Sequence, residues 1–329
     1  MRRRHFIISL SSAMSAWPFA ARAQQKVMPV IGWLNPFSPP ANLGELVNGP
    51  IHRGLSETGF VEGQNMASEY RWAEFHNDRL PALAADLASR KVDLIITAGG
   101  APPALAAKNA TSTIPIVFTF VADPVGAGLV ASLARPGGNL TGFSNLAIEL
   151  TPKRLELLCE LVPQATVIAF LVNPDNKMTE PYIRVVQEAV RVKGIQLPIL
   201  RAETEAEIDA AFASLGQLQA GGLVVAADPF FAFRREQLLA LASRYAVPAI
   251  YEWREFVADG GLISYGIDNA AVARQAGIYA GRILKGAKSA DLPVQQPTTF
   301  LLVVNLNTAK ALGITVPPSI LARSDEVIE

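Results

Sequence analysis

The sequence is poor in the residues that many enzymes and metal sites use, since its 329 residues include one cysteine and three histidines. The single cysteine, Cys159, cannot form a disulfide within the chain, and we expect it to be a small buried hydrophobe in a helix. His52 and His76 are the histidines beyond residue 23, and neither has a metal-ligand spacing such as H-E-x-x-H. No G-x-S-x-G elbow occurs, and no G-x-G-x-x-G follows a strand in the first half. We therefore expect a protein that is not an enzyme and has no cofactor and no metal.

An excess of positive charge is also absent, because 29 basic residues balance 29 acidic ones. Without the four arginines of the first 23 residues, the remaining chain carries 25 basic and 29 acidic residues, a net charge of −4. Nucleic acids and anionic membrane surfaces are bound by basic patches. The charge balance therefore predicts neither partner.

Long hydrophobic runs are absent as well. The longest apolar stretch, Phe6–Ala20, is broken by serines and by Pro18, and falls short of the roughly 20 apolar residues of a membrane-spanning helix. Arginines at positions 2–4 precede it and Ala21-Arg22-Ala23 follows it, which is the three-part pattern of a secretory signal peptide. We predict a signal peptide at residues 1–23 and a mature chain that begins at Gln24.

The export route and the destination follow from the same segment. Arg3-Arg4-His5-Phe6-Ile7 resembles a twin-arginine signal, so the Sec route and the twin-arginine route both stay open. No cysteine follows the predicted cleavage site that could carry a lipid anchor. We expect a soluble monomer in the periplasm.

The 306 residues after position 23 exceed what one hydrophobic core usually supports, so two domains are expected. Short β-branched runs alternate with segments of helical spacing, which is typical of repeated βα units and a mostly parallel sheet. In the first half we predict strands at Met28–Leu34, Ala67–Trp72, Asp93–Ala98 and Ile114–Val121, and helices at Leu43–Thr58, Asp78–Ser89 and Pro102–Asn109. In the second half we predict strands at Val167–Val172, Ile195–Leu200, Gly222–Ala227 and Ala249–Trp253, and helices at Pro152–Leu161, Tyr182–Lys193, Glu205–Leu215 and Arg234–Tyr245.

Two glycine-rich stretches, Pro136–Ser144 and Gly260–Gly266, have the character of passages between lobes. The helix Asn269–Leu284 is expected to return to the first lobe, and the segment around Pro293 and Pro297 to lead back to the second. This predicts an α/β fold with two Rossmann-like lobes and a multi-strand hinge. Lobe 1 would comprise residues 24–142 with 265–290, and lobe 2 residues 143–264 with 291–329. Several passages lying together make a hinge between rigid lobes.

Four strings carry a family resemblance: Asp123–Val130, Arg135–Gly142, Gly261–Gly266 and Ala309–Pro318. They resemble the ABC transporter substrate-binding family that includes tryptophan-binding, TrpX-like proteins, and the likeness runs from about Val30 to Glu329. The resemblance implies a type 1 periplasmic-binding-protein fold that closes on a small-molecule ligand, with an ABC permease and an ATPase as partners. The ligand itself is not implied, because the family is large and few of its members have a known solute. The transporter role comes from the resemblance, since fold alone does not fix function.

Ligands of open parallel sheets bind beyond the carboxyl ends of the strands, which selects a few loops of each lobe. The loop with Gly99 and Gly100 precedes a helix whose N–H groups suit a carboxylate, although a tight turn would also need these glycines. Asp123 and Asp228, each followed by proline, are expected to cap helices or to contact a ligand ammonium. Side-chain amides are expected from Asn35 and Asn173.

Aromatic residues gather at or near predicted strand ends, and we expect at least two of them to line the cleft. The candidates for ligand contact are Trp33, Phe120, Tyr251 and Trp253, with Phe37, Phe230 and Phe231 nearby. Glu252 and Arg254 are expected to form an ion pair between the lobes or to contact the ligand.

The predicted function is the extracytoplasmic capture of a small carboxylate, an aromatic or branched amino acid above all, for an ABC importer. A sugar is the rival ligand, but it would need more side-chain amides and charges than these loops offer. A sensor protein that presents its ligand to a membrane receptor is the alternative function, and a periplasmic enzyme comes after it. A cytoplasmic repressor would need a helix-turn-helix where the signal peptide is predicted.

Overall fold

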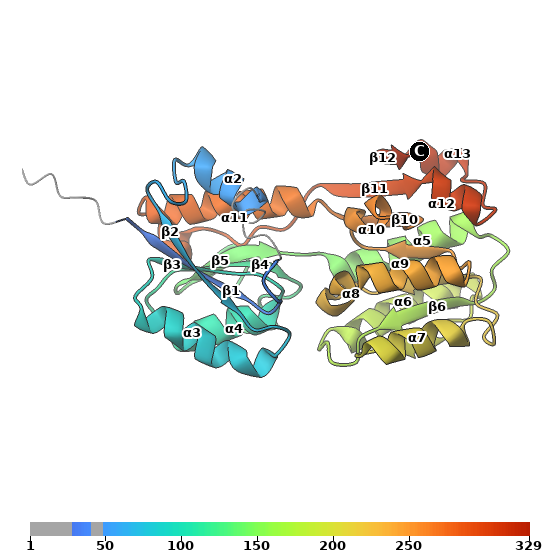
Figure 1. Cartoon of the computed structure of the whole chain (residues 1–329), viewed down its shortest axis with the longest axis horizontal. Coiled ribbons are helices and arrows are strands. Elements are labelled where there is room, and N and C mark those ends of the chain that lie inside the picture. Colours follow the sequence, from blue (N-terminus) through green and yellow to red (C-terminus); the bar gives the residue numbers. More distant parts are fainter. Residues whose placement is uncertain (1–27, 41–48) are drawn as a thin grey trace, which may run out of the picture.

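The computed structural model describes residues 28–40 and 49–329. The predicted signal peptide, the cleavage before Gln24 and the first part of the predicted helix Leu43–Thr58 lie outside these residues. The described part forms two lobes, each with its own β-sheet, which stand side by side in Figure 1. The predicted α/β class with two mostly parallel sheets is confirmed.

The first lobe contains a five-stranded parallel sheet in the order β2-β1-β3-β4-β5. Its strands are β1 (Val30–Asn35), β2 (Ala67–Trp72), β3 (Leu94–Thr97), β4 (Ile116–Val121) and β5 (Leu140–Ser144). Its helices are α2 (Pro50–Glu57), η1 (Asn77–Arg79), α3 (Leu80–Ser89), α4 (Ala101–Ala110), α11 (Asn269–Leu284) and η2 (Ser289–Asp291).

Helices cover both faces of this sheet, which explains why its central strands are apolar throughout. Ile95 packs into a cluster with α3 and α4, whereas its neighbours Leu94 and Ile96 pack into a second cluster with α2 and α11. All four residues of β3 are buried. The sheet thus separates two apolar layers of one lobe.

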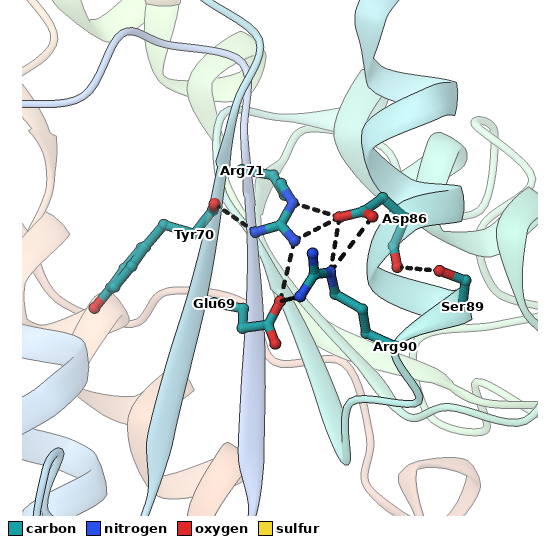
Figure 2. Close-up of polar contacts among 6 residues, drawn as sticks. All are labelled: Glu69, Tyr70, Arg71, Asp86, Ser89 and Arg90. Carbon is teal, nitrogen blue, oxygen red and sulfur yellow. Dashed lines mark hydrogen bonds and ion pairs between the residues drawn. The ribbon is translucent and has the colours of Figure 1, made fainter.

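The edge strand β2 is fixed to α3 by an ion network on its outer side (Figure 2). Arg71 donates from Nε to Asp86 (2.7 Å) and from Nη2 to Glu69 (3.0 Å). Arg90 lies 3.2 Å from Asp86 and 3.3 Å from Glu69, and the Arg71 guanidinium holds the pKa of the exposed Asp86 carboxyl below its ordinary value. The Tyr70 ring points away from this network in Figure 2. Charges on an edge strand also discourage pairing with another chain.

The second lobe contains a seven-stranded sheet in the order β12-β11-β10-β9-β8-β6-β7, in which β10 and β11 are antiparallel. Its strands are β6 (Ile168–Val172), β7 (Ile199–Arg201), β8 (Gly222–Val225), β9 (Ala249–Tyr251), β10 (Ile263–Ile267), β11 (Phe300–Asn305) and β12 (Glu326–Ile328). Its helices are α5 (Ala147–Leu161), α6 (Thr179–Lys193), α7 (Glu205–Ser214), α8 (Pro229–Phe233), α9 (Arg235–Arg244), α10 (Arg254–Ala258), α12 (Leu306–Ala311) and α13 (Pro318–Leu321).

The chain passes between the two sheets three times. The first passage lies between Ser144 of β5 and Ala147 of α5, and the second between Ile267 of β10 and Asn269 of α11. Gln295 still hydrogen-bonds to the first lobe through Gly142 (3.0 Å), so the third passage lies between it and β11. The first two positions differ by two to five residues from the predicted lobe boundaries at 142 and 264, and the third lies five to ten residues beyond the predicted boundary at 290. The second and third passages are adjacent, because the Asp268 N–H donates to the carbonyl of Thr299 (3.3 Å).

Helix α5 begins five residues before its predicted start. We predicted a helix at Pro152–Leu161, and a residue before proline usually disfavours the helical conformation. Instead α5 begins at Ala147 and has Pro152 inside it. The side chains of Thr151 and Arg154 both donate to the Ala147 carbonyl in the first turn of this helix.

Candidate functional site

The loops at the carboxyl ends of the two sheets meet each other, and we call this region the interlobe edge. It comprises residues 35–37, 73–76, 98–101 and 120–123 of the first lobe and 173–176, 226–233 and 252–254 of the second. The ring of Phe75, in the loop after β2, lies 4.3 Å from the ring of Phe233, at the end of α8. Both lobes therefore contribute side chains to one region.

The glycine loop of the first lobe has the geometry that requires glycine. Gly99 and Gly100 have φ values of 83° and 93°, and a Cβ on Gly99 would lie 2.4 Å from Cγ of Pro36. In the described chain the N–H groups of Gly99, Gly100 and Ala101 have no backbone acceptor. Pro102 and Pro103, which follow in α4, have no N–H groups. The loop thus offers a short row of backbone donors at the amino end of α4.

Phe120 occupies a strained position at the end of β4. Its φ is 58°, and the pairing of β4 with β5 shifts register between Phe118 and Val121. Asn145, at the first passage, donates from Nδ2 to the Phe120 carbonyl (3.1 Å). Left-handed backbone at a bulky residue is uncommon and concentrates at functional sites. This irregularity lies at the interlobe edge, next to the first passage, and Phe120 is half-buried there.

Asp228 is buried and fully occupied by donors of its own lobe. It caps α8 by accepting the Phe230 N–H (2.8 Å), as predicted, and it accepts from Asn173 (3.1 Å) and Asn176 (2.7 Å). Burial raises the pKa of its carboxyl, and these hydrogen bonds oppose that rise. Asp228 and Asn173 are thus brought together, with Asn176 as a third member. Direct contact of Asp228 with a ligand ammonium stays a prediction.

Asp123 differs from Asp228 in its surroundings. It is exposed and accepts the Gly126 N–H (2.8 Å), so it caps a turn, whereas a helix was expected there. Asn35, the remaining polar candidate, ends β1 opposite Trp72 and is half-buried. Their contact with a ligand also stays a prediction.

Two aromatic candidates lie inside the lobes. Trp33 is 5% exposed and stacks between His52 (4.8 Å) and Tyr70 (5.5 Å) in the core of the first lobe. Tyr251 is 1% exposed, stacks on Phe256 at 4.5 Å, and its hydroxyl has no hydrogen-bond partner. Trp253 is half-buried at the start of α10, so it remains at the interlobe edge with Phe120.

The expected ion pair of Glu252 and Arg254 between the lobes is wrong. Arg254 pairs with Glu326 of the same lobe (2.5 Å), because α10 packs beside the C-terminal strands. Glu252 is buried and faces Arg154 of α5 at 3.7 Å. Burial raises the pKa of the Glu252 carboxyl to about 7, and the charge of Arg154 opposes part of that rise.

Phe75 and Phe233, which join the two lobes, were not among the residues predicted from the sequence. We call these two residues and their neighbours Phe37 and Arg234 the rim. Phe75 contacts Phe37 of its own lobe (5.8 Å) as well as Phe233, and Arg234 lies over the Phe233 ring at 5.2 Å. Glu74 and Phe75 have φ values of 54° and 65°, and no local sequence pattern predicts this left-handed backbone. Arg154, by contrast, could have been found, since it lies on the apolar stripe of α5 with Leu155, Leu158 and Leu161.

Three further features of the described residues concern metal ligands, membrane-spanning helices and a cavity outside the interlobe edge. Among residues 28–40 and 49–329, His, Cys, Asp and Glu side chains do not gather in threes as a metal site would need. Across the same ranges, every helix is too short or too polar to span a bilayer. A cavity of about 480 Å³ lies beside Lys108 and Gly137–Asn139, before the start of β5 and therefore away from the interlobe edge.

Comparison with known proteins identifies the family. Residues 36–328 match the family described as ABC transporter substrate binding protein. The chain belongs to this family. A tyrosine-binding protein from Clostridioides difficile (strain R20291) is 31% identical over 264 residues, which are 80% of this chain and 75% of that protein.

Solved structures of this family's fold resemble the chain closely. A conserved domain protein from Vibrio cholerae has a TM-score of 0.81 at 28% identity, with 91% of this chain and 99% of that chain covered. A domain from Streptococcus pneumonia in complex with L-Trp has a TM-score of 0.80 at 26% identity, with coverage of 91% and 99%. The ligand-free, open structure of a substrate-binding protein with adhesive properties from Clostridium difficile has a TM-score of 0.66 at 28% identity, with coverage of 92% and 99%.

The protein is therefore the substrate-binding component of an ABC transporter. Proteins of this family act outside the cytoplasm and normally bind their substrates without transforming them. Two more distant structures share the fold alone. They are a transcription regulator like protein from Staphylococcus haemolyticus, at 13% identity and a TM-score of 0.58, and a LacI transcriptional regulator from Bacillus cereus, at 16% identity and a TM-score of 0.55.

Proposed function

We propose that this protein captures an amino acid with an aromatic or branched side chain between its lobes and delivers it to an ABC permease and its ATPase. The tyrosine-binding relative and the structure in complex with L-Trp support this ligand class. The mature protein would begin at Gln24 and act as a periplasmic monomer.

The arrangement of the lobes is the observation that carries the proposal. The TM-score is 0.80 with the L-Trp complex but 0.66 with the ligand-free, open structure. Identity and coverage are nearly the same in both comparisons, so the difference favours a difference in lobe arrangement. The contact between Phe75 and Phe233 agrees with lobes that approach each other at the rim. This is the arrangement that would enclose a ligand.

The interlobe edge has suitable chemistry for such a ligand. The unpaired N–H groups at Gly99, Gly100 and Ala101 would bind the carboxylate, with the positive end of α4 behind them. Phe120 and Trp253, both half-buried, would contact the apolar body. Asp123 and the Asp228 cluster are the carboxylates proposed to lie near the ammonium.

A calorimetric panel would test the ligand class. Aromatic and branched amino acids should bind, their 2-oxo analogues should bind more weakly, and simple sugars should not bind. Phe120→Ala should weaken binding of the best amino acid by about 1 to 3 kcal/mol, because one large apolar contact is lost. Tyr245→Ala is the matched control, since this exposed ring follows α9 at the opposite end of the second sheet. Tight binding of a sugar with no response to any carboxylate would refute the proposal.

A further inference from the structure

Arg154 connects two of the three passages between the lobes. Its Nη2 donates to the carbonyl of Ala147, the residue that follows the first passage, and to Oγ1 of Thr151 (2.8 Å). Its Nη1 donates to the carbonyl of Tyr265 in β10 (3.3 Å), two residues before the second passage. The Arg154 side chain is fully buried. A single buried cation therefore binds the backbone at the second-lobe ends of both passages.

Glu252 completes this cluster but lacks hydrogen bonds of its own. Its side chain is 2% exposed, and among residues 28–40 and 49–329 neither carboxylate oxygen has a donor within hydrogen-bond distance. The cation paired with it there is Nη1 of Arg154, at 3.7 Å. Gly266, the next residue towards the second passage, leaves no room between β10 and Glu252, since a Cβ there would lie 2.1 Å from the Glu252 carbonyl oxygen. A buried carboxylate without donors is costly to keep charged.

The other titratable groups around this pair come from three places. Burial is the main reason why the pKa of the Tyr182 hydroxyl, on α6, is raised. The charges that also act on this hydroxyl are those of Glu252, Arg154, Asp228 and Glu149. Asp228 is already held by Asn173, Asn176 and the α8 amide. Glu149 is exposed in the first turn of α5. Glu252 is thus the carboxyl that is both buried and without donors at the hinge.

We propose that Arg154 and Glu252 form a proton-linked hinge lock, in which Glu252 takes up a proton as the lobes close and Arg154 then holds the two passages together. This inference rests on the proposed function in one respect, namely that the two lobes close around a ligand. Glu252 is a positioning residue here, because it acts on the hinge through Arg154.

The direction of the pH effect follows from the burial of Glu252. In the described arrangement, burial raises the pKa of Glu252 from its ordinary 4.5 to about 7. Glu252 follows β9 at the interlobe edge, so separation of the lobes should admit water to the pair and return the pKa of the Glu252 carboxyl towards its ordinary value. The closed arrangement therefore binds more protons, so closure is favoured as the pH falls through 7. From pH 8 to pH 6 the ratio of closed to open molecules should rise about tenfold.

Distances between spin labels measured without ligand would test the lock. In a Cys159→Ala background, labels at Asp78→Cys and Ala210→Cys report on the separation of the lobes, since both positions are exposed, one on each lobe. The population at short distance should increase about tenfold from pH 8 to pH 6. Glu252→Gln should respond little to pH, and Glu255→Gln, the same change at an exposed position on α10, should respond like the wild type.

Arg154→Lys keeps the charge but cannot reach all three oxygens, so its distances should be broad at both pH values. An equal pH response in wild type and Glu252→Gln would overturn the proposal, and so would a wild type that does not respond between pH 8 and pH 6. L-tryptophan titrations at both pH values form a separate arm, in which wild type should bind more tightly at pH 6. Absence of tryptophan binding at both values would count against the proposed function alone, because the label distances need no ligand.

Discussion

Each lobe has an aspartate followed by a proline just beyond a strand, Asp123 in the first lobe and Asp228 in the second. The sequence predicted both as caps, and both do accept a backbone N–H. Their surroundings differ completely, because Asp228 is 3% exposed and Asp123 is exposed at a turn. Burial depends on which loops fold over the residue, and a two-residue motif carries no information about that.

Replacing each aspartate by alanine should separate the two roles. Asp228→Ala removes the α8 cap and leaves the amides of Asn173 and Asn176 without their acceptor. The free energy of unfolding should fall by about 2 to 4 kcal/mol. Asp123→Ala, the matched control, removes one exposed turn bond and should cost about 1 kcal/mol or less. Urea unfolding at fixed pH measures both, and equal losses would contradict the assignment of Asp228 as the buried anchor of its loops.

At the scale of elements, α11 is the segment that returns from the second lobe and packs against α2 of the first. The sequence predicted its bounds, Asn269–Leu284, because its apolar spacing and its Asp268 cap are local signals. The closeness of the two helices could not be predicted. Gly277 allows it, since a Cβ there would lie 2.0 Å from the Ile51 carbonyl oxygen.

Gly277→Ala should therefore push α11 away from α2 and lower the free energy of unfolding by about 1 to 3 kcal/mol through overpacking. The matched control is Gly216→Ala, at a position where a Cβ would meet nothing within 4 Å. The control should change stability by about 0.5 kcal/mol or less. Thermal unfolding monitored by circular dichroism compares the two variants. A Gly277→Ala protein as stable as the control would show that the helix crossing adjusts freely.

Other elements show why sequence patterns predicted the sheets better than the site. Strands such as β2 and β6 were found within a residue of their observed bounds, because the aromatic residues of β2 and the apolar run of β6 are local signals. The predicted helix Arg234–Tyr245 agrees with α9 within a residue at each end, and Asp228 and Pro229 start the separate short helix α8 before it. Trp33 and Tyr251 were chosen for their place near strand ends, yet both rings turn into the cores. Which way a ring turns depends on its partners from other elements.

At the scale of the whole molecule, the rings of Phe75 and Phe233 form a contact between the two lobes away from the hinge. Phe75 is held towards the second lobe by its left-handed backbone and by its N–H bond to the Pro36 carbonyl (2.7 Å). Phe233 is held by Arg234, which also pairs with Glu205. Phe75 and Phe233 are still 37% and 50% exposed, so the contact covers only part of each ring. Such a contact can form and break as the lobes move.

A double-mutant cycle on Phe75 and Phe233 should reveal this rim contact as a closing interaction. If the rings meet only when the lobes are closed, either alanine variant loses the same contact, which is worth about 0.5 to 1.5 kcal/mol. Each single variant should then bind L-tryptophan about two- to tenfold more weakly, and the double variant little more weakly than either single one. Tyr245→Ala, an exposed ring outside the rim, should bind as the wild type does. Titration calorimetry measures the cycle, and small-angle scattering should show a larger radius for the unliganded variants. If the losses of binding free energy in the two single variants add up in the double variant, the two rings act separately. Closure would then depend on the hinge and the ligand alone.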